Sequence, residues 1–109
     1  MAYDEALAQR VRQALVGEPE VVEMKMFGGT GYLLGGNMAC GVNGSNLIVR
    51  VGPQEYENAL SEPGVLVFDM TGRPMTGWVQ VTPLGLPDQV ALQAWIERGL
   101  AYARGLPPK

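Results

Sequence analysis

The chain divides into segments of two different hydrophobic periods, and this division constrains the fold more than any other feature. Apolar residues recur at spacings of three and four between Asp4 and Val16, which predicts an amphipathic helix. Between Val21 and Val51 the period falls to two, and glycine pairs interrupt the apolar runs. This pattern is typical of short strands joined by tight turns, so it predicts a meander of three or four antiparallel strands.

The first strand of this meander alternates apolar and polar side chains. Val22, Met24 and Met26 occupy one side of it, which suits a strand with one covered face, and we expect Met24, Met26 and Met38 to pack beneath the helices. The pair Asn43-Gly44 predicts a two-residue hairpin turn, because both central residues of a type I′ turn need positive φ.

The second half of the chain continues the alternation of helix and strand. Pro53 predicts the first turn of a short helix, and apolar runs predict strands over Val65–Met70 and Gly77–Val81. The last helix is predicted from Asp88 to Arg104. The order is therefore one helix, three or four strands, a helix, two strands and a helix. This order favours a single domain over residues 1–109, a two-layer α+β fold with an antiparallel sheet and helices on one face.

The chain lacks the residues that most often perform catalysis. It has no histidine and one cysteine, Cys40, which lies among apolar strand residues. Histidine is the commonest general base, and a reactive thiol needs a cationic or basic neighbour. We therefore expect a buried structural cysteine and assign no catalytic, metal-binding or cofactor-binding residue. The chain is interpreted as a protein without enzymatic activity.

Charge and hydropathy restrict the partners and the location. Eleven acidic and eight scattered basic residues give a net charge of −3, whereas nucleic-acid binders usually present a basic face. Direct binding of nucleic acid is therefore not expected. No apolar stretch approaches the ~18 residues that a membrane span requires. The acidic amino end lacks the pattern of a signal peptide, so we expect a cytoplasmic protein that does not contact membranes.

One loop has the composition of a binding segment. It runs from Thr71 to Met75, contains Arg73, and is followed by Trp78. Arginine, methionine and tryptophan are enriched at protein interfaces, and loops on a rigid sheet often carry function. The alternative is structural, with Arg73 paired to a carboxylate and Trp78 filling the core.

Several motifs of the chain occur together in one family. They are Lys25-Met26-Phe27-Gly28-Gly29, Gly31-Tyr32-Leu33, Leu47-Ile48-Val49-Arg50-Val51, and Thr71-Gly72-Arg73-Pro74-Met75 with Gly77-Trp78. In this order and spacing, over roughly Val11 to Leu106, they resemble the TfoX N-terminal domain family. The resemblance implies a two-layer α+β domain. It also implies a regulatory role, since the family is named for a bacterial competence regulator that acts with the cyclic-AMP receptor protein.

The motif residues supply the candidate interaction site, and no cofactor is implied. They are Lys25, Phe27, Gly28, Gly29, Arg73, Pro74, Met75 and Trp78. We expect a regulatory or adaptor domain that binds another protein, linked to transcription or competence regulation. The alternative is a small-ligand-binding or enzymatic domain with an anion site near Phe27, Arg73 and Trp78. Direct DNA binding is a third hypothesis, and a homodimer paired through an edge strand is compatible with all three.

Overall fold

The computed structural model describes residues 4–26, 28–69 and 72–108. Its helices and strands, in chain order, are α1 (Glu5–Ala14), β1 (Val22–Met26), β2 (Gly29–Leu34), β3 (Asn37–Asn43), β4 (Asn46–Arg50), α2 (Tyr56–Leu60), β5 (Val65–Val67), β6 (Trp78–Val81), the 3₁₀ helix η1 (Pro83–Gly85) and α3 (Gln89–Arg104). The described strands form one six-stranded sheet in the order β1-β2-β3-β4-β6-β5. All neighbouring pairs are antiparallel, so the predicted α+β class is confirmed.

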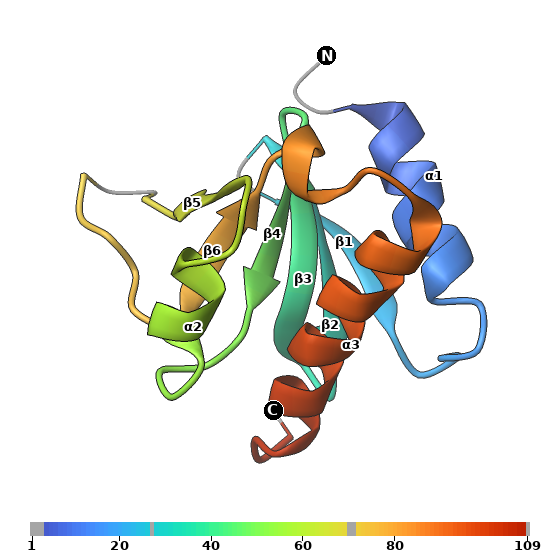
Figure 1. Ribbon diagram of the computed structural model, residues 1–109. Helices are drawn as coiled ribbons and strands as arrows, with labels where there is room; N and C mark the ends of the chain where they lie inside the picture. The colour runs from blue at the N-terminus through green and yellow to red at the C-terminus, as the bar shows by residue number, and fades with distance from the viewer. Residues whose placement is uncertain (1–3, 27, 70–71, 109) are drawn as a thin grey trace.

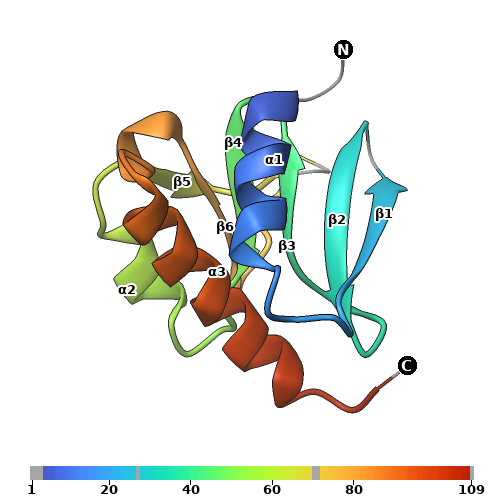
Figure 2. The same cartoon turned by 90° about the vertical axis from the view of Figure 1, so that its right-hand side faces the viewer.

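The helices lie on one face of the sheet and enclose the core against it (Figures 1 and 2), as predicted. Four buried side chains form a row across paired strand positions on this face: Tyr32, Cys40, Val49 and Val79. Leu92, Ile96 and Leu100 of α3 are fully buried in the same core. Within the described residues, no helix combines the length and the apolar character needed to cross a membrane.

Side-chain caps define the starts of the two longer helices. The Asp4 Oδ1 accepts a hydrogen bond from the backbone N–H of Ala6 at 2.9 Å, and the Asp88 Oδ1 accepts one from that of Ala91 at 2.8 Å. Such caps satisfy donors that the helix itself leaves unpaired. Both helices therefore begin where the sequence predicts.

Three predicted boundaries shift. Pro53 lies in a turn before α2 and not in its first turn. Val51 and Gly52, just before it, both donate backbone hydrogen bonds to the Gly77 carbonyl, and Gly52 has a positive φ of 89°, which is not helical. Strand β5 ends at Val67, and Met70 at the end of the predicted strand lies outside the described residues.

The third shift concerns the hairpin between β3 and β4. Asn43 pairs with Asn46, so the two loop residues are Gly44 and Ser45 and not Asn43 and Gly44. Gly44 has a φ of 58°, a value that glycine adopts without steric cost. The predicted hairpin is present, one residue later along the chain.

The apolar side of β1 faces away from the helices, contrary to prediction. Glu23 pairs with Tyr32 across the strands and shares its helix-facing side, whereas Val22 and Met24 lie on the opposite face, 57% and 51% exposed. The reason is that α1 presents Arg12 above this strand, and its guanidinium binds the Glu23 carboxylate. The side chain of Met26 lies outside the described part of the structure.

Candidate functional site

The motif residues lie on two separate parts of the sheet. Lys25 is exposed on β1, Gly28 follows with a φ of 74°, and Gly29 begins β2, while Phe27 lies outside the described residues. Trp78 lies on β6, and β2, β3 and β4 separate that strand from β1. The segment from Lys25 to Gly29 therefore does not lie next to the loop that contains Arg73 in the sheet order.

Gly29 has a backbone reason to be glycine. A Cβ atom at this position would overlap the carbonyl oxygen of Val42 on β3. Backbone atoms of a paired strand cannot move aside without breaking the pairing. This motif glycine therefore allows β2 to approach β3 closely.

Hydrogen bonds hold the described loop residues on both sides of Arg73. The Asp69 Oδ1 accepts a hydrogen bond from the Gly72 N–H at 2.6 Å, and the Met75 N–H donates to the Phe68 carbonyl at 2.9 Å. Arg73 itself is exposed, and the described residues provide it with no ion pair. Arg73 is therefore an uncompensated cation among the described residues, between two backbone groups that hydrogen bonds hold in place.

Trp78 connects this loop to the sheet. Its ring lies 6.2 Å from that of Phe68, and the Arg50 guanidinium stacks 5.1 Å above it. Leu66 on β5 points to the same face of the sheet and is 51% exposed. We call this region the loop surface, and it consists of Leu66, Arg73, Pro74, Met75 and Trp78.

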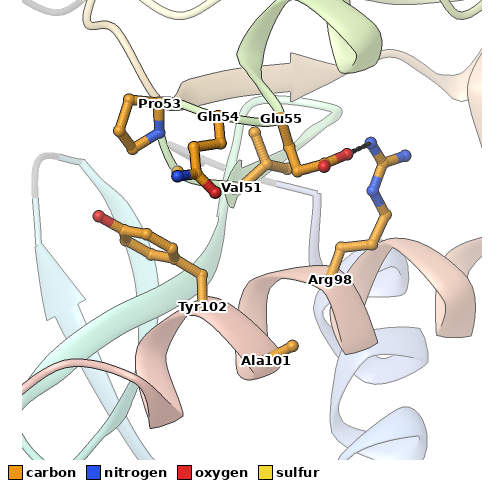
Figure 3. A pocket seen from close by; sticks show the side chains of 8 residues that line it. Val51, Pro53, Gln54, Glu55, Arg98, Ala101 and Tyr102 are labelled. Carbon is orange, nitrogen blue, oxygen red and sulfur yellow. Dashed lines mark ion pairs between the residues drawn. The ribbon is translucent and has the colours of Figure 1, made fainter.

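A groove of about 600 Å³ lies between α3 and the segment that follows β4 (Figure 3). It is lined by Val51, Gly52, Pro53, Gln54, Glu55, Arg98, Ala101 and Tyr102. The Tyr102 ring packs against Gly52, where a Cβ would lie 2.5 Å from it. Arg50 stacks on this ring too, at 5.4 Å, and so links the groove to Trp78.

The positive charge in the groove is already compensated. Arg98 forms ion pairs with Glu62 at 2.6 Å and with Glu55 at 3.9 Å, and its guanidinium lies 4.3 Å from the Trp95 ring. An entering anion would compete with these carboxylates. Arg73 does not line the groove, so the groove differs from the anion site expected near that residue.

Cys40 is fully buried, as predicted. Burial raises the pKa of its thiol to about 12, which keeps the sulfur protonated at neutral pH. A buried protonated thiol is not a nucleophile. Among the described residues, no group of three or more histidine, cysteine, aspartate or glutamate side chains could hold a metal ion.

Three residues that the argument uses here were not among the candidates, namely Leu66, Arg50 and Tyr102. Arg50 stands in one of the family-like motifs. It alternates with the buried Val49 and Val51, and this pattern could have indicated that its side chain faces the opposite side of the sheet. Tyr102 is distant in sequence, and no local pattern places it beside Gly52. Packing of α3 on the sheet brings the two together.

The fold and the loop surface together define a two-layer α+β domain with a held, exposed loop at one side of its sheet. The chain belongs to the TfoX N-terminal domain family, whose model matches residues 5–103, so the resemblance seen in the motifs is confirmed. This family is associated with competence regulation and is not a known enzyme family. Comparisons with curated proteins and with solved structures find no match.

Proposed function

We propose that this domain is a non-enzymatic regulatory module that binds another protein through its loop surface, in competence or transcription regulation. The observation that carries the proposal is that Arg73 is exposed and forms no ion pair with the described residues, while hydrogen bonds hold the neighbouring residues Gly72 and Met75. We place this activity in the cytoplasm, where a bacterial regulator of gene expression acts.

The backbone hydrogen bonds at Gly72 and Met75 favour binding, because these described loop residues have less freedom to lose. Ordering a flexible loop on binding costs free energy that reduces the affinity. Here the hydrogen bonds from Gly72 to Asp69 and from Met75 to Phe68 supply that order in advance. The loop surface therefore resembles a preorganised docking site.

The chemistry of the loop surface indicates what the partner presents. Arg73 offers a cation and Leu66 offers apolar area, with Trp78 partly exposed between strand and loop. Arginine and tryptophan are frequent energetic centres of interfaces. A matching partner carries a carboxylate that reaches Arg73 and an apolar side chain that covers Leu66.

The test is affinity purification from the native organism, followed by reconstitution with the purified partner. Arg73→Ala and Leu66→Ser are expected to weaken binding about tenfold or more, since each removes an interface anchor. Arg104→Ala and Leu84→Ser are the matched controls, because these residues are exposed elsewhere on the molecule. Melting temperatures of all variants show whether the fold is intact.

Three outcomes would overturn the proposal. If Arg73→Ala and Leu66→Ser retain wild-type affinity for every partner, the loop surface is not the binding site. If an anionic metabolite raises the melting temperature of the wild type but not of Arg73→Ala, the ligand-binding alternative replaces the proposal. A salt-sensitive gel shift would instead favour direct DNA binding.

A further inference from the structure

On its outer edge, β1 pairs with no other described strand. Among the described strands, β1 pairs with β2 alone, and it lies at the outer edge of the sheet (Figure 2). An exposed strand edge offers N–H and C=O groups to another strand. The other edge strand, β5, has three residues against the five of β1. β1 is therefore the longer free edge.

The backbone groups that β1 offers can be identified. The Thr30 hydroxyl donates a hydrogen bond to the Met24 carbonyl oxygen at 3.4 Å, so this carbonyl points toward β2. Successive residues of a strand direct their N–H and C=O groups to alternate edges. The groups of Glu23 and Lys25 therefore point outward, away from the sheet.

We propose that two copies of this chain form a dimer by antiparallel pairing of their β1 strands, with Met24 opposite Met24 at the two-fold axis. In this register, Glu23 of each copy lies opposite Lys25 of the other. These are the residues with outward N–H and C=O groups, so each Glu23–Lys25 pair exchanges two backbone hydrogen bonds. An interface of this kind is isologous, which is the usual form of a homodimer.

The charges of β1 select this register. An axis at Glu23 would place two glutamates opposite each other, and an axis at Lys25 would place two lysines opposite each other. Both arrangements are unfavourable because like charges directly opposite each other repel. With the axis at Met24, opposite charges meet at both pairs. Lys25 is exposed and has no ion pair within the described part of the chain, so its charge is available to a second copy.

The interface would extend a charge network that already exists. Arg12 binds Glu5 and Glu23, each at 2.8 Å. Lys25 from the second copy would add a cation beside Glu23, giving alternating charges from α1 across the interface. Networks of several charges contribute more than isolated surface pairs.

The exposed apolar side chains of β1 fit the same dimer. Met24 lies on the face turned away from the helices and is 51% exposed. At the two-fold axis, Met24 of one copy would contact Met24 of the other. The Cβ atoms of residues directly opposite each other in antiparallel strands lie about 4.5–5.5 Å apart. The dimer therefore covers apolar area that the monomer leaves in water, and methionine adapts readily to such contacts.

The first test is the mass in solution across a range of protein concentrations. We expect a dimer of twice the 11.7 kDa chain. Lys25→Glu opposes Glu23 with a second carboxylate and should raise the dimer dissociation constant about tenfold or more. Arg73→Glu is the matched control, because it makes the same charge change on the loop surface, away from β1, and should leave the dimer unchanged.

Mixing two charge variants tests the pairing itself. In a dimer of the Lys25→Glu variant, two acidic residues lie opposite each other at positions 23 and 25. In a dimer of the Glu23→Lys variant, two basic residues do. When the two are mixed, each interface position again joins opposite charges, so a heterodimer should form. Circular dichroism and melting curves verify that both variants are folded despite the loss of the Arg12–Glu23 pair.

Cysteine cross-linking tests the register. Met24→Cys should form a disulfide between copies, because residues at the axis lie within the Cα range of a disulfide, about 4.4–6.8 Å. Val22→Cys is the control on the same face, since in this register its two copies lie about 14 Å apart. Buried Cys40 should not take part.

A monomer at all concentrations would overturn the proposal. So would a dimer that Lys25→Glu leaves intact, or a cross-link at Val22→Cys without one at Met24→Cys. The proposal does not rest on the proposed function, because β1 and the loop surface lie in different parts of the sheet. A variant of the loop surface can therefore lose its partner and keep the dimer, and a variant of β1 can lose the dimer and keep the partner.

Discussion

The guanidinium of Arg12 on α1 binds both carboxylate oxygens of Glu23 on β1, with Nε to Oε1 and Nη2 to Oε2 each at 2.8 Å. Two parallel hydrogen bonds of this type fix orientation as well as distance. The hydrogen bonds from Arg12 hold the pKa of Glu23 below its usual value. This pair joins the first helix to the edge strand.

The Arg12–Glu23 pair should make stability depend on pH. Because the pKa of Glu23 is lower in the folded state, its stabilising effect is present above the unfolded pKa of about 4.3 and is lost as the pH falls through the folded pKa. Glu23→Gln should cost up to about 1 kcal/mol at neutral pH, since the pair is partly exposed. Urea unfolding at a series of pH values measures this difference.

The control for that experiment is Glu20→Gln. Glu20 is exposed and makes no side-chain hydrogen bond within the described residues. Its substitution should leave stability nearly unchanged across the same pH range. A Glu23→Gln difference that persists at the acid end would contradict the assignment of the effect to the carboxylate charge.

Gly29→Ala should destabilise the fold by about 2–4 kcal/mol, because the new Cβ would overlap the Val42 carbonyl and force two paired strands apart. Gly17→Ala is the matched control, since a Cβ there meets no atom within 4 Å. Chemical denaturation of both variants gives the comparison. Equal stabilities would show that β2 and β3 are not as close as described.

Cys40 should resist thiol reagents in the folded protein. Its sulfur is buried, and its pKa is raised to about 12, so little thiolate exists even at pH 9. In denaturant, one thiol per chain should react rapidly. Rapid labelling of the native protein, with the melting curve unchanged, would contradict the described burial.

The local features of the fold were predictable because neighbouring residues decide them. Asp4 and Asp88 cap helices through bonds to residues two or three positions further along. The inward stripe of α3, including Leu92 and Ile96, follows from helical spacing. The positions of the hairpin and of β5 were predicted less accurately, since pairing with other strands determines where each strand ends.

The sequence by itself determined the order of helices and strands, the family and the inert character of Cys40. It also determined that β1 has one apolar and one charged side. Only the tertiary structure decided which side faces the helices, because alternation defines two faces without orienting them. The packing of α1, with Arg12 above Glu23, turned Met24 outward and Glu23 inward. Packing likewise placed Tyr102 against Gly52 and separated Lys25 from Trp78, since contacts between distant segments depend on how the layers assemble.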